Sequence, residues 1–172
     1  MRRRVVVTGM GVVAPNAYGI EDFEKALREG RSGIRFVQEL KDLNFACQVG
    51  GVPQGIDKVL EQYFDEEERM SINDNIGYAA IASIDAWKDA GFTVPDHDFD
   101  QVDWATGAII GSGIGGMDTI GKIVIPMVNE GKTRRMGSRI VEQVMNSGTS
   151  ARIGGLLALG NQVTSNSSAC ST

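Results

Sequence analysis

Residues 104–116 read Trp104-Ala105-Thr106-Gly107-Ala108-Ile109-Ile110-Gly111-Ser112-Gly113-Ile114-Gly115-Gly116. The apolar first half predicts a buried β-strand over Trp104–Ile110, because a short apolar run bounded by turn residues is typical of a parallel sheet. The glycines of Gly111–Gly116 allow a tight turn, and they let another backbone or a long apolar ligand approach closely. We therefore predict a buried strand that runs directly into a glycine-rich turn.

Strands and helices alternate on both sides of this stretch. The predicted strands are Arg4–Val13, a short one at 46–49, Trp104–Ile110 and one at about 162–167, and the predicted helices are 20–27 with a stop at Gly30, Ser71–Ala90 and Ile140–Leu159. This order predicts an α/β fold with a mostly parallel sheet. No linker divides the 172 residues, so we expect one domain over residues 1–172.

Composition and charge exclude several classes of protein. The chain has 42% hydrophobic and 23% charged residues and a net charge of -5, which argues against general nucleic-acid or membrane-surface binding. No apolar run reaches the roughly 18 residues of a membrane span, and the Val5–Val7 run is too soon broken by glycine for a signal peptide. Two cysteines and one histidine make neither a disulfide framework nor a zinc site. We expect a cytoplasmic protein without a metal.

Cys170 is the candidate nucleophile. It lies in Ser165-Asn166-Ser167-Ser168-Ala169-Cys170-Ser171-Thr172, among small residues directly after a predicted strand. A sharp strand-to-helix turn exposes a thiol, and a helix N-terminus favours its reactive thiolate form. The alternative is that Cys170 is a small core residue, as lone cysteines often are. We expect Cys47 to be structural and His97 to be a solvated loop residue.

The glycine-rich turn also has the spacing G-x-G-x-x-G, which occurs in dinucleotide-binding proteins. However, it lies far from the N-terminus, no acidic residue ends a following strand, and residues 123–128 are too apolar for a phosphate-binding turn. A nucleotide-dependent oxidoreductase is therefore the weaker alternative.

Five segments in order resemble the N-terminal half of the β-ketoacyl-acyl carrier protein synthases of types I and II. They are Arg4–Gly11, Leu27–Ile34, Ile110–Gly116, Met145–Ala151 and Ser168–Ser171. The resemblance implies a thiolase-like fold, in which two similar α/β halves pack as α-β-α-β-α layers. It also implies a homodimer, and that residues 1–172 are the N-terminal domain, with the C-terminal half absent from this chain.

The resemblance implies an acyltransferase that makes fatty acids or related polyenes or polyketides. Cys170 would take an acyl group from the phosphopantetheine of acyl carrier protein, and malonyl-acyl carrier protein would lose CO₂ and condense with that group. No free cofactor is implied. The catalytic histidines and lysine of the family belong to the second half, beyond Thr172. The alternative within the family is a non-catalytic, pocket-shaping subunit of a heterodimer, which typically lacks the nucleophile.

Three further residues take roles from the resemblance. Ile114 corresponds to a residue of the acyl pocket that gates the chain. Arg134 and Arg135 fall where the family carries a basic pair for acyl carrier protein, although an ordinary exposed pair is the alternative. A second basic patch of the family falls near Arg69, but here Glu66, Glu67 and Glu68 precede it.

Overall fold

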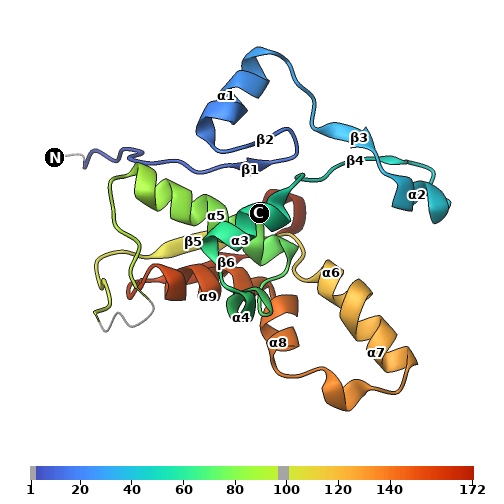
Figure 1. Cartoon of the computed structure of the whole chain (residues 1–172). Coiled ribbons are helices and arrows are strands. Elements are labelled where there is room, and N and C mark those ends of the chain that lie inside the picture. The colour runs from blue at the N-terminus through green and yellow to red at the C-terminus, as the bar shows by residue number, and fades with distance from the viewer. Residues whose placement is uncertain (1–2, 97–100) are drawn as a thin grey trace.

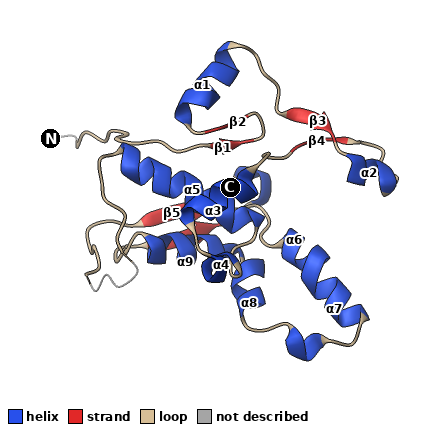
Figure 2. Ribbon diagram, in the orientation of Figure 1, coloured by secondary structure: helices blue, strands red, loops and turns tan. Residues whose placement is uncertain are grey.

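The computed structural model describes residues 3–96 and 101–172 (Figure 1). Within these ranges the strands pair in three two-stranded sheets. Two are antiparallel and one, β5 with β6, is parallel (Figure 2). The strands are β1 Val13–Ala14, β2 Ala17–Tyr18, β3 Ile34–Phe36, β4 Val49–Gly51, β5 Ala108–Gly111 and β6 Val163–Asn166. The prediction of a mostly parallel sheet is thus right only for β5 and β6.

Helices connect and cover these strands. The α-helices are α1 Ile20–Arg28, α2 Gln38–Asp42, α3 Ile56–Tyr63, α4 Glu66–Arg69, α5 Asp74–Asp89, α6 Met117–Thr119, α7 Ile125–Asn129, α8 Arg139–Val144 and α9 Asn146–Leu156. Three further helical turns are not α-helical: η1 Ile120–Val124 is a π-helix, and η2 Thr133–Arg135 and η3 Ala169–Ser171 are 3₁₀ turns.

Helix α5 is the central helix, and it confirms the prediction for Ser71–Ala90. It begins after Asn73, whose side chain accepts a hydrogen bond from the N–H of Ile76 and so caps the helix. Ile76, Ala80 and Ile84 recur at helical spacing and are buried. The helix ends before Gly91, whose φ of 83° suits a glycine.

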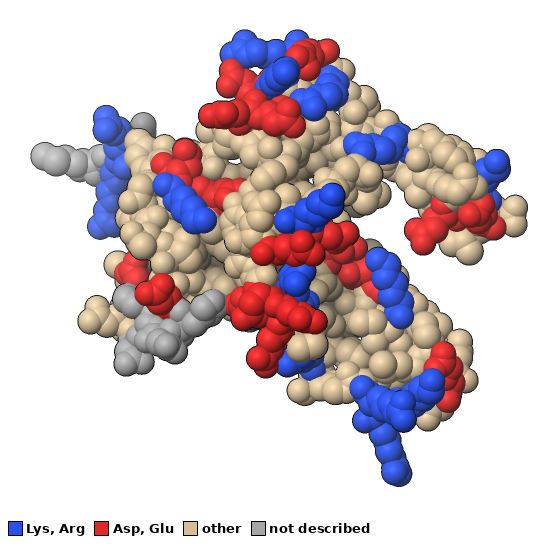
Figure 3. Space-filling model, viewed as in Figure 1, with Lys and Arg blue, Asp and Glu red and all other residues tan. Residues whose placement is uncertain are grey.

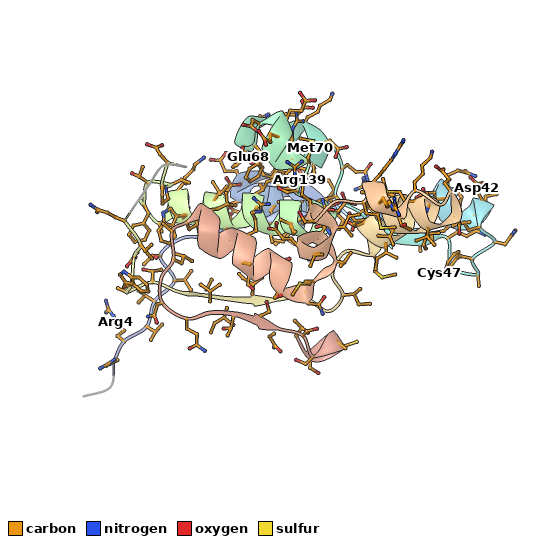
Figure 4. The ribbon with its side chains drawn as sticks, turned by 90° about the horizontal axis from the view of Figure 1, so that it is seen from below. Arg4, Asp42, Cys47, Glu68, Met70 and Arg139 are labelled. Atoms are coloured by element: carbon orange, nitrogen blue, oxygen red, sulfur yellow. The ribbon has the colours of Figure 1, made fainter. Side chains whose placement is uncertain are left out.

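Helix α9 lies on one face of the β5–β6 sheet, and α5 packs against α9 (Figure 4). Ile153 and Leu157 of this region are buried, and Gly154 brings the helix backbone close to Val163 of β6. On β5, exposed and half-buried side chains alternate, and Ile109 is 78% exposed. The helices therefore cover one face of this sheet and leave apolar surface on the other.

The predicted strand Arg4–Val13 is wrong for most of its length. Only Val13 lies in a strand, and Val5 and Val7 are 91% and 81% exposed. The segment instead follows α5: the N–H of Met10 donates to Asp89 at 2.9 Å, and a Cβ on Gly9 or Gly11 would overlap carbonyl groups of that helix. Glycine here permits close approach to a helix, and within residues 3–96 and 101–172 the valines pair with no strand.

Two other predicted elements differ from the structure. The helix predicted over Ile140–Leu159 is two helices, because the backbone at Met145 is extended (ψ 135°). Gly148 fits there against the carbonyl of Glu142, where any Cβ would overlap. The strand expected at 46–49 is shifted to β4 and pairs with β3, forming an arm that extends away from the body (Figure 1).

A chain of hydroxyl and carboxyl groups ties the N-terminal hairpin to the body. The hydroxyls of Tyr18 and Tyr63 are 2.6 Å apart, and that of Tyr63 donates to Asp85 of α5 at 2.5 Å. Burial and the hydrogen bond to Asp85 raise the pKa of Tyr63 well above its usual range. The Tyr63 hydroxyl therefore stays protonated as the pH rises into the alkaline range.

Candidate functional site

Cys170 lies in the 3₁₀ turn η3 directly after β6, and its side chain is exposed. The N–H groups of Ser171 and Thr172 donate to the carbonyls of Ser168 and Ala169, and the N–H of Ser168 donates to the Thr172 hydroxyl at 2.8 Å. Ala169 has a φ of 52°, a left-handed conformation that costs a residue with a Cβ about 1–2 kcal/mol. Cys170 is thus presented on a tight, strained turn, with its side chain exposed in this structure.

The glycine-rich segment lies beside this turn. Because β5 and β6 are parallel and in register, Gly111 pairs with Asn166, and the N–H of Ser112 donates to the Asn166 carbonyl at 3.0 Å. A Cβ on Gly111 would come within 2.6 Å of Cγ2 of Thr172, and one on Gly113 would lie 3.5 Å from the Ala169 carbonyl. The two segments that the sequence analysis singled out therefore meet at one end of the parallel sheet.

A polar network, which was not predicted from the sequence, supports this end of the sheet. Asn75 of α5 donates to the hydroxyl of Thr149 at 2.8 Å and to that of Ser112 at 3.4 Å. Asn146, the first residue of α9, donates to the hydroxyl of Ser167 at 2.7 Å. The sequence signal was the Asn146-Ser147-Gly148 run, whose residues favour caps and turns over helix interiors.

Ile114 lies at the tip of the glycine-rich segment and is 70% exposed. Gly115 and Gly116, which follow it, are buried against Asn146 and Gln143. Gly116 has a φ of 63°, and a Cβ there would overlap the Gln143 carbonyl. The loop that carries Ile114 is therefore fixed at its base, while the Ile114 side chain itself projects from it.

Arg134 and Arg135 lie apart from Cys170, in the turn η2 between α7 and α8. Both are exposed. Figure 1 shows that the segment from α7 to α8 extends away from the β5–β6 sheet. Figure 3 shows a group of basic side chains at the outer end of this segment. This basic surface stands free of the body.

The acidic residues before Arg69 have local structural roles. Asp65 and Glu68 form a capping box: the N–H of Glu68 donates to Asp65 at 2.8 Å, and the N–H of Asp65 donates to Glu68 at 2.9 Å. Glu67 pairs with Arg139 of α8 at 3.6 Å, in the group where Figure 4 labels Glu68, Met70 and Arg139. Arg69 pairs with Glu61 at 3.2 Å. Glu67, Glu68 and Arg69 are thus engaged in local contacts at this position.

The remaining predictions from the sequence concern Cys47, His97, a metal site and membrane-spanning helices. Cys47 is exposed at the end of the β3–β4 arm (Figure 4), with its thiol 3.8 Å from the carbonyl of Val49. His97 lies outside the described residues. Over residues 3–96 and 101–172, no group of histidine, cysteine and acidic side chains is arranged to hold a metal ion. No helix in the same ranges is long and apolar enough to cross a membrane.

Comparison with known proteins identifies relatives of this chain. The family model described as "Beta-ketoacyl synthase, N-terminal domain" matches residues 2–172. The 3-oxoacyl-[acyl-carrier-protein] synthase 2 of Vibrio cholerae is 36% identical over 119 residues, which are 69% of this chain and 27% of that protein. The same-named protein of Synechocystis is 29% identical over 133 residues, 77% of this chain and 30% of that protein. The matched residues thus span less than a third of the length of these relatives.

Solved structures of ketosynthases share the fold. A β-ketoacyl synthase from Burkholderia phymatum aligns with a TM-score of 0.73 over 99% of this chain and 40% of its own, at 24% identity. The ishigamide ketosynthase/chain length factor aligns with a TM-score of 0.74 over 97% of this chain and 40% of its own, at 23% identity. A type II polyketide ketosynthase solved in complex with its acyl-carrier protein gives 0.74 over 98% of this chain and 38% of its own, at 21% identity. These matches confirm the prediction of a thiolase-like α/β fold.

Proposed function

Because this chain belongs to the β-ketoacyl synthase family, we propose that it supplies the nucleophile of a 3-oxoacyl-acyl carrier protein synthase. The observation that carries the proposal is the placement of Cys170, exposed on a strained turn at the end of a parallel sheet and beside a glycine-rich segment. A nucleophile on such a turn is accessible to a substrate carbonyl, and glycines beside it leave room for the acyl chain. Residues 1–172 are proposed as the N-terminal domain of this enzyme.

The proposed reaction has two stages. In the first, the thiolate of Cys170 attacks the thioester carbonyl of an acyl-carrier protein. A carbon–sulfur bond forms to Cys170, the bond to the phosphopantetheine sulfur breaks, and the carrier leaves as a thiol with the proton that Cys170 gave up. The backbone N–H of Cys170 is proposed as one donor to the oxyanion that forms in this step.

In the second stage, malonyl-acyl carrier protein loses CO₂, and the resulting carbanion attacks the acyl carbonyl held on Cys170. A carbon–carbon bond forms, and the Cys170 sulfur leaves and takes up a proton. The product is a β-ketoacyl group on the carrier, as in fatty-acid or related polyene and polyketide synthesis. The carrier's phosphopantetheine is part of the substrate, and no resident cofactor or metal is proposed.

Arg134 and Arg135 are proposed to receive the acidic acyl carrier protein. Both residues are exposed on the segment that connects α7 and α8, so a large partner can reach them. Charge reversal at both positions should raise KM for the acyl carrier protein and weaken its salt dependence, since exposed charges act mainly on encounter. Lys41→Glu, at an exposed position on α2, is the control for a reversed charge elsewhere on the surface.

We further propose that the protein is a homodimer and that it is located in the cytoplasm. Ile114 is proposed to gate the acyl chain.

The second candidate function is a non-catalytic subunit that shapes the pocket of a heterodimer. The cysteine at position 170 favours the enzyme, because such subunits typically lose the nucleophile.

A paired substitution tests the proposal. In the full-length protein, Cys170→Ala should abolish β-ketoacyl product formation, whereas Cys47→Ala should leave it unchanged, although both thiols are exposed. Full turnover by the Cys170→Ala protein would rule out the enzyme assignment. Stabilisation of the protein against heat by NAD or NADP would instead favour the nucleotide-dependent oxidoreductase.

A further inference from the structure

Asn146 occupies a position between the two segments that form the candidate site. It is the first residue of α9, and it is half-buried behind the turn that carries Cys170. Its side-chain amide N–H donates to the Ser167 hydroxyl at 2.7 Å, and its backbone carbonyl lies 3.5 Å from the Ser165 hydroxyl. Both serines belong to the segment that runs from β6 into the turn of Cys170.

The other end of the same amide group faces the glycine-rich segment. A Cβ built on Gly115 would lie 2.8 Å from Oδ1 of Asn146, and 3.3 Å from its backbone N and Cα. Gly115 is therefore in direct van der Waals contact with Asn146. One residue touches the loop of Ile114 on one side and the turn of Cys170 on the other.

The break between α8 and α9 places Asn146 there. The extended backbone of Met145 ends α8, and α9 restarts at Asn146 in a new direction, so that its first side chain faces β6. The hydroxyl of Ser150, one turn further along α9, is 2.5 Å from that of Ser165. Two side chains of α9 thus bond to Ser165 in β6 and to Ser167 just after it, and so tie this segment to the helix.

On this basis we infer that Asn146 is a positioning residue, which holds the Cys170 turn at a fixed distance from the glycine-rich segment. The inference rests on the proposed role of Cys170 as the acyl-accepting nucleophile. Asn146 acts through Ser167 and has no part in the chemistry. Because nucleophilic attack is sensitive to displacements of about 1 Å, which can cost roughly a hundredfold in rate, loss of this support should slow acylation.

The test measures acylation of the full-length enzyme by an acyl-acyl carrier protein in single turnovers, with Asn146→Ala, Ser167→Ala and the double variant. We expect the maximum acylation rate to fall roughly ten- to hundredfold for Asn146→Ala, with little change in the carrier concentration that gives half the maximum. Ser167→Ala should show a smaller fall. The double variant should be no slower than Asn146→Ala, since both remove the same hydrogen bond.

Two controls separate this inference from other effects. Asn161→Ala removes an asparagine that donates to the Ala105 carbonyl at 3.3 Å, so it should leave the acylation rate unchanged. Because Cys47 is also exposed, alkylation by iodoacetamide is followed on the peptide that contains Cys170. Its rate reports the accessibility of this thiol without any carrier protein, and this rate should change in Asn146→Ala. A change in the thermal midpoint alone, with both rates unchanged, would indicate a merely structural role and overturn the inference.

The failures of the two proposals are distinguishable. If Cys170→Ala still forms the acyl-enzyme, the proposed function is wrong. If Cys170→Ala abolishes acylation but Asn146→Ala and Ser167→Ala both acylate at the wild-type rate, only the positioning role is wrong. Should Asn146→Ala fail to fold, Ser167→Ala tests the same bond from its acceptor side, and a wild-type rate there overturns the inference.

Discussion

A methyl group added to Gly111 would come within 2.6 Å of Cγ2 of Thr172, although 61 positions separate the two residues along the chain. This contact joins the glycine-rich segment to the turn of Cys170. It arises because β5 and β6 are parallel and in register, so both segments leave the sheet at the same end. The packing at this junction decides whether the proposed site is formed.

Gly116→Ala should destabilise the protein by about 1–3 kcal/mol, because its φ of 63° is left-handed and a Cβ would overlap the Gln143 carbonyl. Gly121→Ala is the matched control: it lies in the helical turn η1 with open space around it, and helix propensity predicts no loss. Urea unfolding of both variants gives the comparison. Equal stability of the two would contradict the packing described for the loop base.

Asn73→Ala should be more damaging than the loss of an ordinary helix cap. The side chain accepts from the N–H of Ile76 at 3.0 Å and donates to the Gln143 carbonyl at 2.8 Å, and it is 7% exposed. The cap is worth about 1 kcal/mol, and a buried carbonyl without a donor costs about 1–3 kcal/mol more. Asp65→Ala, which removes an exposed cap, should cost only the first of these. Chemical denaturation gives the free energy of unfolding of both variants. A larger loss in Asp65→Ala than in Asn73→Ala would contradict this account.

The stability of the protein should depend on pH through Asp74. Burial, then the neighbouring carboxylate of Asp118, raises the pKa of Asp74 above 3.8, although Lys122 opposes this. The folded state therefore favours the protonated form, and this stability is lost as pH rises through the folded pKa. Asp74→Asn should raise the thermal midpoint at neutral pH, and the gain should shrink as the pH falls below the folded pKa.

Asp103 provides a control, because its contribution to stability should change with pH in the opposite direction. A hydrogen bond from the Thr106 hydroxyl, then one from the N–H of Ala105, lowers its pKa below 3.8. Asp103 therefore contributes stability above its unfolded pKa, which is lost as pH falls through the folded pKa. Asp103→Asn should lower the midpoint at neutral pH. Changes of the same sign in both variants would show that the two environments are wrongly described.

Ile114→Gly should widen the range of acyl chains that the full-length enzyme accepts. In its proposed gating role, the exposed branched side chain at the tip of the loop limits the room for the acyl chain, and glycine would remove this limit. The ratio of kcat/KM for long and short acyl-carrier substrates should rise by about tenfold, which is a typical effect of pocket size. The substitution leaves Gly115 and Gly116 in place, so the base of the loop should be unchanged. An unaltered ratio would place the chain gate elsewhere.

The helices were predicted better than the strands, for a physical reason. The spacing of Ile76, Ala80 and Ile84 and the stop at Gly91 are local signals, and α5 follows them. A strand needs a partner that may be far away in sequence. Val5–Val7 have strong β-propensity, but they pair with no strand in the part of the chain that the structure describes, so propensity alone led to a wrong prediction.

The candidate site was predictable only as separate parts. Cys170 and the glycines stood out because their residue types carry chemistry or conformational freedom. The meeting of Gly111 and Thr172 depends on strand register, which the sequence alone did not give. The role of Asn146 depends on the break at Met145, and a continuous helical pattern over Ile140–Leu159 concealed that break.

The central claim is that Cys170 accepts the acyl group, and peptide-level mass spectrometry tests it most directly. The full-length protein is incubated with an acyl-acyl carrier protein, without malonyl-carrier, and then digested. We predict the acyl mass on the peptide that contains Cys170, and its absence from the Cys170→Ala protein. An acyl group on another residue, retained in Cys170→Ala with full turnover, would contradict the account.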